Sequence, residues 1–220
     1  MRQCLLIDPM HPSIFEMLST IGWTGVDASG KKMEEIIPVN NSYEGVFVRT
    51  RIRVDEKLLG KDPKVKFVAR AGAGLDNIDL EFLEKHAIKV VHASEGNRDA
   101  VGEYTLGALL SLLRNIPKAD SEVRQSIWLR EENRGMELMG KTVGIIGYGN
   151  MGQAFAKRLS GFDCTVLAYD KYKTNFSDAY AHESTLETIF EKADMLSVHV
   201  PPVARSYRSR PSQRVYAQEK

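Results

Sequence analysis

The chain has 220 residues, of which 43% are apolar and 27% charged, and its formal net charge is +1. This composition is typical of a soluble globular protein with one large or two small domains. A net charge near zero gives no electrostatic reason to expect nucleic acid or a membrane as partner. The apolar runs are too short for a signal peptide or a membrane span, and the two cysteines are interpreted as reduced thiols. We therefore expect a cytoplasmic protein.

The first part of the chain alternates short apolar runs with helical patterns. Continuous β-branched runs predict strands at 3–8, 45–49, 65–70 and 88–93. Apolar residues at helical spacing predict helices at 12–21 and 79–87. Such runs fit strands buried on both faces of a parallel sheet. The alternation predicts an α/β domain with right-handed crossovers over residues 1–96.

Residues 98–116 predict a long helix that ends at Pro117. Its apolar residues cover more than one face, so we expect it to be buried on two sides, as a helix joining two domains would be. A polar helix follows at roughly 118–130. We expect the domain boundary just before the long helix, so that the second domain covers residues 97–201.

The second domain repeats the alternation of strands and helices. The pattern predicts strands at 142–147, 164–169 and 195–200, a weakly signalled strand at 179–182, and helices at 150–160 and 185–192. Ser184 and Glu187 match a capping box at the start of the last helix. The fold class predicted for the whole chain is α/β, with two Rossmann-like parallel-sheet domains, the first of them flavodoxin-like.

A glycine-rich stretch lies directly after the first strand of the second domain. Gly147, Gly149 and Gly152 form a G-x-G-x-x-G pattern between a strand and a helix, the context that makes the pattern specific. The glycines permit a tight turn, close approach of a pyrophosphate, and close packing of helix on strand. Asn150 and Met151 would add backbone N–H groups at the positive end of the helix dipole.

Asp170 ends the next predicted strand, where dinucleotide-binding folds carry an acidic residue. A carboxylate there accepts hydrogen bonds from a ribose hydroxyl and repels a 2′-phosphate, so we expect NAD rather than NADP. Lys171 and Lys173 follow immediately and weaken this discrimination. The alternative is that the glycines only shape a turn and Asp170 only caps a strand.

Four segments carry a resemblance to a known family: RAGAGLDNID (70–79), NRDAVGEYTLGALLSLLRNI (97–116), GKTVGIIGYGNMG (140–152) and ADMLSVHVP (193–201). In order and spacing they resemble the D-isomer-specific 2-hydroxyacid dehydrogenases. The resemblance covers residues 1 to about 201. Within the family, GVFVRTRIRV (45–54) is most similar to the phosphoglycerate dehydrogenases, which open serine synthesis. The resemblance implies an NAD-dependent oxidoreductase acting on the CH–OH group of a D-2-hydroxy acid.

The resemblance implies substrate-binding roles in the first domain. Arg49 and Thr50 would face the anionic groups of a small hydroxy-acid or keto-acid substrate. The backbone amides of Ala73 and Gly74 would receive its carboxylate, and Asn97 would lie on the substrate side of the cleft. Arginine suits bidentate recognition of carboxylate or phosphate. For the glycines of this stretch, a tight turn alone is the alternative.

The resemblance also implies cofactor contacts outside the glycine loop. Val101, on the long helix, would border the nicotinamide pocket, and His199, Val200 and Pro201 would form the opposite wall of the crevice. Two acids of the first domain, Asp76 and Asp79, are expected to cap the helix that follows them.

Oxidation of a 2-hydroxy acid needs a base for the hydroxyl proton and a cation that grips the carboxylate. In the family a histidine, a glutamate and an arginine supply these functions, and all three follow the segment that ends at Pro201. Residues 202–220 resemble nothing in the family and are expected to form a disordered tail. The histidines are interpreted as structural, so we assign no catalytic residue and expect a truncated, inactive form.

Two further expectations concern metals and partners. The His, Cys and Asp residues show no metal-ligand spacing, so we expect no metal site. The strand at 195–200 would lie at an open sheet edge, which favours association, and we expect a homodimer. A second interpretation of the chain is an NAD-binding module or partner-binding protein without turnover.

Overall fold

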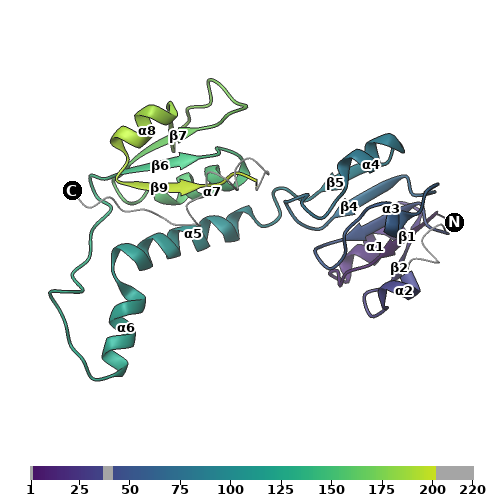
Figure 1. The fold of residues 1–220 in the computed structure, drawn as a ribbon, viewed down its shortest axis with the longest axis horizontal. Helices are drawn as coiled ribbons and strands as arrows, with labels where there is room; N and C mark the ends of the chain where they lie inside the picture. The colour runs from purple at the N-terminus through teal and green to yellow at the C-terminus, as the bar shows by residue number, and fades with distance from the viewer. Residues whose placement is uncertain (1, 37–41, 202–220) are drawn as a thin grey trace. The chain divides into compact units, whose positions relative to one another are not determined.

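The computed structural model describes residues 2–36 and 42–201, and the chain divides into two compact units, Met1–Asn97 and Arg98–Lys220. Each unit is built around its own parallel β-sheet (Figure 1). The predicted α/β class with two parallel-sheet domains is confirmed. The tail predicted to be disordered, 202–220, lies outside the described residues.

The first unit has a five-stranded parallel sheet with strand order β2-β1-β3-β4-β5. This is the order of the flavodoxin-like doubly wound folds. In chain order the elements are β1 (Arg2–Leu6), α1 (Ser13–Thr20), β2 (Trp23–Asp27), α2 (Met33–Ile36), β3 (Gly45–Val48), α3 (Glu56–Leu59), β4 (Phe67–Arg70), α4 (Leu80–Lys85) and β5 (Lys89–His92).

Strand β1 is buried on both faces of this sheet. Leu5 belongs to one apolar cluster together with Val46, whereas Leu6 belongs to a second cluster with Leu18 of α1. Successive side chains of a strand point to opposite faces, so a continuous apolar run is what double burial requires. Strand β5 has the same kind of sequence but lies at the sheet edge, and Val91 there is 58% exposed. At an edge, the run does not lead to burial.

Three elements of the first unit are not predicted by the sequence pattern: β2, α2 and α3. Strand β2 carries Gly25 at its centre, and a Cβ there would lie 3.0 Å from Phe15 and 3.1 Å from Leu18 of α1. The glycine, which weakens the strand signal, therefore gives α1 room to pack on β2. Helices α2 and α3 have four residues each, too few to show a helical period.

The second unit has a four-stranded parallel sheet with strand order β8-β7-β6-β9. Its elements are α5 (Arg98–Leu113), α6 (Ile116–Arg124), β6 (Thr142–Ile146), α7 (Asn150–Leu159), β7 (Thr165–Tyr169), β8 (His182–Glu183), α8 (Leu186–Lys192) and β9 (Met195–Val198). Strand β6 has neighbours on both sides that follow it in the chain, and a switch of this kind is where nucleotides bind in open α/β sheets. Among the described residues, β9 pairs only with β6.

Helix α5 buries one face, against α7. Gly102 makes the close approach possible, because a Cβ there would lie 2.9 Å from the carbonyl oxygen of Ala154. Leu109 is buried, but Tyr104 is 79% exposed and Leu112 is 48% exposed. The expected burial on two sides is therefore not observed for α5.

The long helix predicted over 98–116 stops earlier, and Pro117 does not end it. Helix α5 ends at Leu113, and Asn115 adopts a left-handed conformation with φ of 53°. Pro117 lies in the first turn of α6, where a missing N–H costs no helical hydrogen bond. The second helix is consequently shorter than predicted and ends at Arg124.

Helix α8 is capped one residue later than predicted. The side chain of Thr185 accepts a hydrogen bond from the N–H of Thr188, with 3.2 Å between the atoms. Ser184 instead donates its backbone N–H to the carbonyl oxygen of Ala168 in β7, at 2.8 Å. The predicted capping box of Ser184 and Glu187 is therefore wrong, because backbone pairing next to the sheet takes up Ser184.

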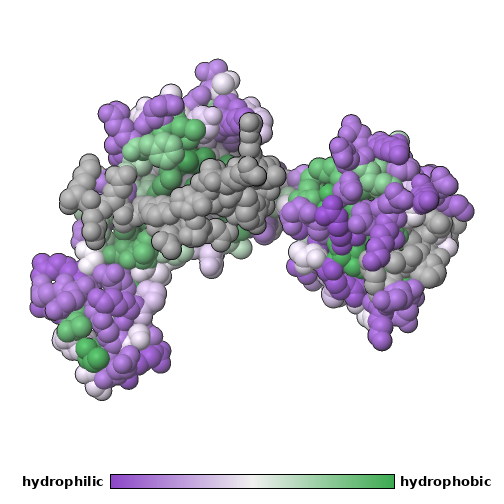
Figure 2. Space-filling model, viewed as in Figure 1, coloured by the Kyte–Doolittle hydropathy of each residue, from purple (hydrophilic) through white to green (hydrophobic). Residues whose placement is uncertain are grey.

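We call α6 and the loop after it the arm (residues 116–136). No residue of α6 is buried, and Figure 1 shows the helix leading away from the sheet of its unit. Figure 2 shows apolar side chains set among the polar surface of this segment. The large exposed apolar side chains of the arm are Ile116, Val123, Ile127, Trp128, Leu129 and Met136. None of the helices in the described parts of the chain is long and apolar enough to cross a membrane.

Candidate functional site

The three glycines between β6 and α7 differ in the space that the structure leaves around them. Gly147 has φ of 96°, and a Cβ on it would lie 2.5 Å from the carbonyl oxygen of His199. A Cβ on Gly152 would lie 2.2 Å from the carbonyl oxygen of Gly147. A Cβ on Gly149, in contrast, would meet no atom of residues 2–36 or 42–201 within 4 Å. The fold thus requires glycine at positions 147 and 152, whereas Gly149 leaves open space next to the loop.

That open space lies at the start of helix α7. Gly149 is the N-cap of the helix, and Asn150 and Met151 form its first turn together with Gly152. The first turn contains no acidic side chain, and the last turn contains two basic ones. The N-terminal N–H groups and the helix dipole can therefore act on a phosphate without a competing local carboxylate.

The carboxylate of Asp170 is fixed at the end of β7, beside the glycine loop. Its Oδ2 accepts a hydrogen bond from the N–H of Tyr148 and its Oδ1 accepts one from the N–H of Tyr172, both at 2.9 Å. Each oxygen keeps a lone pair, because a carboxylate has about four acceptor sites. The residues present fit a dinucleotide: open space at the second glycine, a helix start, and an oriented carboxylate on the ribose side.

The two lysines after Asp170 are engaged elsewhere. The ammonium of Lys173 donates a hydrogen bond to the carbonyl oxygen of Tyr148 at 2.8 Å. The ammonium of Lys171 lies 5.5 Å from the ring centroid of Tyr172. Lys173 therefore supports the glycine loop. Because its ammonium is bound there, we expect it to attract a 2′-phosphate less than the sequence suggests.

Sequence reasoning missed Tyr148, the residue between the first two glycines. It is fully buried, its hydroxyl donates to Asp178 at 2.9 Å, and its ring stacks on Phe176 with 5.2 Å between the centroids. Burial and the neighbouring carboxylate raise the pKa of the hydroxyl. Tyr148 thus ties the glycine loop to the segment that follows β7. An aromatic residue inside a glycine motif was the available signal.

The other predicted cofactor residues lie at the end of β9 and on α5. His199 is half-buried, with its Nε2 2.9 Å from the hydroxyl of Ser197 and its ring 5.8 Å from that of Phe155. Burial lowers its pKa below the usual value of 6.5. Val200 and Pro201 are exposed, and Val101 is half-buried, one residue before the contact of α5 with α7. The backbone contact of His199 with the glycine loop brings the ends of β6 and β9 together.

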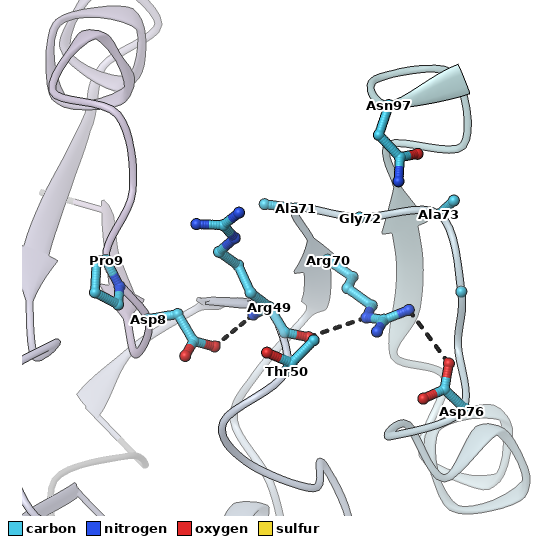
Figure 3. A pocket seen from close by; sticks show the side chains of 11 residues that line it. Asp8, Pro9, Arg49, Thr50, Arg70, Ala71, Gly72, Ala73, Asp76 and Asn97 are labelled. Carbon is cyan, nitrogen blue, oxygen red and sulfur yellow. Dashed lines mark hydrogen bonds and ion pairs between the residues drawn. The ribbon is translucent and has the colours of Figure 1, made fainter. Parts of the chain in front are cut away.

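The first unit contains a pocket of about 470 Å³ at the carboxyl ends of its strands (Figure 3). Loops after β1, β3, β4 and β5 contribute to its lining. The pocket is lined by all five predicted substrate-binding residues: Arg49, Thr50, Ala73, Gly74 and Asn97. They come from three separate stretches of sequence, and the sheet topology brings them together.

Arg49 is held by its backbone, which leaves its side chain available. Its N–H donates to Oδ2 of the buried Asp8 at 2.5 Å, and its carbonyl oxygen accepts hydrogen bonds from Arg70 and Asn77. Within the described part of the chain, the Arg49 guanidinium makes no hydrogen bond or ion pair. Asp8 is neutralised separately by Arg51, at 3.7 Å. The Arg49 cation is therefore free to meet an anion.

The loop after β4 adds backbone donors to the same pocket. The carbonyl oxygen of Ala73 lies 3.0 Å from Nδ1 of His92. In residues 2–36 and 42–201, the N–H groups of Ala73 and Gly74 donate to no protein atom. Asp79 caps α4 as predicted, accepting from the N–H of Phe82, but Asp76 instead faces Arg70, at 3.6 Å. The predicted capping role of Asp76 is wrong, because Asp79 is the N-cap of α4.

Sequence reasoning also missed Asp8 and Arg70, which line the pocket. Both are charged residues next to buried apolar strands, and that position was the available signal. Over the described residues, no group of three or more His, Cys, Asp or Glu side chains could hold a metal ion. None of the histidines lines the pocket.

These features define a class of protein: a dinucleotide-binding α/β unit that follows a flavodoxin-like unit with an anion pocket. The chain is similar in sequence to the family of D-isomer specific 2-hydroxyacid dehydrogenases. The family model for the NAD binding domain matches residues 106–209. This confirms the resemblance and identifies NAD as the cofactor. The match extends to residue 209, eight residues beyond Pro201, where the motifs alone predict that the resemblance ends.

Curated relatives agree with this family, and a solved structure agrees with the fold. The chain is 33% identical over 204 residues to a D-3-phosphoglycerate dehydrogenase of Methanocaldococcus jannaschii, covering 91% of this chain and 39% of the relative. It is 31% identical to a hydroxypyruvate reductase of Thermotoga maritima, covering 88% and 63%. A crystal structure of a Pyrococcus horikoshii protein superimposes with a TM-score of 0.80 at 26% identity, covering 94% and 64%. The chain thus spans about two fifths of its phosphoglycerate dehydrogenase relative.

Proposed function

We propose that this chain binds NAD in its second unit and a small anionic D-2-hydroxy acid or keto acid, 3-phosphoglycerate above all, in its first unit. The observation that carries the substrate proposal is the convergence of uncommitted donors on one pocket: the Arg49 guanidinium and the N–H groups of Ala73 and Gly74. Such donors suit carboxylate and phosphate oxygens. The relatives named D-3-phosphoglycerate dehydrogenase support the choice of acid. We also propose a role in serine biosynthesis.

In this proposal the chain's own residues bind and orient. Arg49 and Thr50 take one anionic group, the two amides take the carboxylate, and Asn97 borders the substrate. Gly149 and the start of α7 receive the pyrophosphate, while Asp170 accepts from a ribose hydroxyl. When bound, the nicotinamide supplies hydride acceptance.

The nicotinamide end of the cofactor is assigned to a smaller group. Val101 borders it, and His199, Val200 and Pro201 form the opposite wall.

Both cysteines are free thiols, Cys4 buried and Cys164 partly buried. Free thiols support a reducing compartment, and we propose the cytoplasm.

We further propose that this chain alone does not turn over its substrate. A base must lie within hydrogen-bond reach of the hydroxyl proton. Of the histidines nearest the two sites, His92 is hydrogen-bonded to the carbonyl oxygen of Ala73. His199 is hydrogen-bonded to the hydroxyl of Ser197, and burial lowers the pKa of His199. The alternative function, an NAD-binding or partner-binding protein without turnover, shares this expectation.

We propose that the chain forms a homodimer through the arm. The nine residues of α6 bury no side chain within the described unit, and isolated helices of that length are marginal in water. The exposed apolar residues of the arm, Trp128 among them, would be covered by the same segment of a second copy. A net charge near zero opposes self-association only weakly.

The function is tested by titrating the full chain with NADH and with 3-phosphoglycerate, and by assaying NADH formation with both present. We expect saturable binding of both ligands and no turnover. Binding of NADH without the acid supports the alternative function, and measurable turnover contradicts the proposal of inactivity.

Sedimentation of the unmodified chain and of Trp128→Ser tests the dimer. We expect a monomer only for the variant, and a monomeric unmodified chain contradicts the proposal.

A further inference from the structure

Arg70, the last residue of β4, lies beneath the anion pocket with its side chain only 7% exposed. Its Nη1 is buried and has no hydrogen-bond partner among the residues that the structure describes. The nearest opposite charge is Oδ1 of Asp76, at 3.6 Å, on a side chain that is 68% exposed. A buried cation with an unsatisfied donor is costly, which points to a role beyond stability.

The two ends of the Arg70 guanidinium reach the two loops that form the pocket (Figure 3). Its Nε donates to the carbonyl oxygen of Arg49 at 3.0 Å, in the turn after β3. Its Nη1 faces Asp76, in the loop after β4. A planar, rigid guanidinium that contacts both loops fixes their separation, which a flexible ammonium does less well.

Gly74 shows how closely this loop rests on Arg70. A Cβ on Gly74 would lie 2.7 Å from Nη1 of Arg70 and 2.5 Å from Oδ1 of Asp76. At Gly72 the same addition comes no closer than 4.0 Å to Arg70. The backbone that presents the free N–H of Gly74 to the pocket is therefore seated on the Arg70–Asp76 pair.

We propose that Arg70 is a positioning residue of the anion pocket. It holds the Arg49 turn and the Ala73–Gly74 amides at the separation that a substrate anion requires. Its buried charge also adds a positive potential below the pocket, where low dielectric strengthens it. This inference rests on the proposed substrate site and deepens it, since neither the sequence pattern nor the free donors require a second arginine beside Arg49.

The first test uses Arg70→Met in the full chain, with Arg2→Met as a control that removes a cation from the opposite end of the parallel sheet. We expect Arg70→Met to raise the Kd for 3-phosphoglycerate at least tenfold and to leave the Kd for NADH unchanged. Without ligand, the amide NMR signals of Ala73 and Gly74 should already shift in Arg70→Met. Arg2→Met should change none of these. The proposal is overturned if Arg70→Met shifts neither amide NMR signal and leaves the Kd for 3-phosphoglycerate unchanged.

Arg70→Lys separates position from charge. Lysine keeps the cation but loses the Nε donor and the planar fork, so we expect the Kd for 3-phosphoglycerate to recover only in part. Full recovery would mean that charge alone matters, and positioning would be wrong.

The second test also covers the case in which Arg70→Met does not fold. Gly74→Ala should weaken 3-phosphoglycerate binding severalfold while Gly72→Ala does not, although both keep their N–H groups. Where Arg70→Met folds, the effect of Gly74→Ala should vanish in the double variant. Equal losses at both glycines, or an effect independent of Arg70, overturn the proposal. If the unmodified chain binds no 3-phosphoglycerate, the proposed function fails, and the ligand-free amide shifts still decide the role of Arg70.

Discussion

The carboxylate of Asp170 accepts a hydrogen bond from the backbone N–H of Tyr148, with 2.9 Å between the atoms. This contact joins the end of β7 to the glycine loop, so that the groups assigned to the ribose and to the pyrophosphate are held as one rigid set. The second oxygen is fixed by the N–H of Tyr172. The orientation of the carboxylate is therefore set before any cofactor binds.

The first prediction follows from this arrangement. NADH should bind more tightly than NADPH, and Asp170→Ala should narrow the preference, because it removes both the ribose acceptor and the repulsion of a 2′-phosphate. Fluorescence titration with both cofactors measures the ratio of the two Kd values. Equal affinities in the unmodified protein would refute the assignment of Asp170.

A second prediction compares two glycines of the same loop. Gly152→Ala places a Cβ 2.2 Å from a backbone oxygen, so we expect a loss of about 1–3 kcal/mol in unfolding free energy, as for other overpacked sites. The added methyl group of Gly149→Ala meets no atom of the described residues within 4 Å, so this variant should leave Tm unchanged. It should nevertheless weaken NADH binding, since its methyl group occupies the pyrophosphate space. Calorimetry and titration of both variants decide, and a large fall in Tm for Gly149→Ala would contradict this account.

The third prediction concerns the cation of the anion pocket. Arg49→Ala should weaken 3-phosphoglycerate binding tenfold or more and leave NADH binding unchanged, because Arg49 lies in the first unit and its guanidinium makes no hydrogen bond or ion pair among the described residues. Arg53→Ala is the matched control, since that side chain is 64% exposed and pairs with Asp55. A loss confined to NADH would show that Arg49 is wrongly assigned.

The fourth prediction concerns pH. Burial lowers the pKa of His199 in the folded protein below the usual 6.5, so the unfolded chain binds the proton more readily. The contribution of neutral His199 to stability is therefore fully present above pH 6.5 and is lost as the pH falls through the lowered pKa. Tm should fall between pH 7.5 and 5.5, and His199→Gln should flatten that fall. His182→Gln, at an exposed position, should leave the slope as it is, and an unchanged slope in His199→Gln would count against the argument.

The sequence predicts the sheets and the glycine loop well, for a local reason. A strand buried on both faces must be apolar throughout, and a turn that admits no Cβ must be glycine, so β1 and Gly147 carry their own signals. The position of Asp170 follows from the strand before it. The roles of these residues follow from their local backbone conformation, and that conformation can be predicted from residues nearby in the sequence.

The features that sequence reasoning misses depend on distant partners. Tyr148 is an ordinary aromatic residue until Asp178 and Phe176 fold onto it. Arg70 is one of many arginines until the loops after β3 and β4 close around it. The cap of α8 moves to Thr185 because a sheet strand takes the backbone of Ser184. No local pattern contains such pairings.

The arm also sets how the molecule exchanges its amide hydrogens with solvent. Local opening is easiest where few apolar side chains are buried, so α6 should exchange its amide hydrogens rapidly while β6 and β7 exchange slowly. Asn115 separates the two helices by a left-handed residue, so α6 can fray without opening α5. Deuterium uptake in α6, measured against protein concentration, would therefore report self-association without a covalently attached probe.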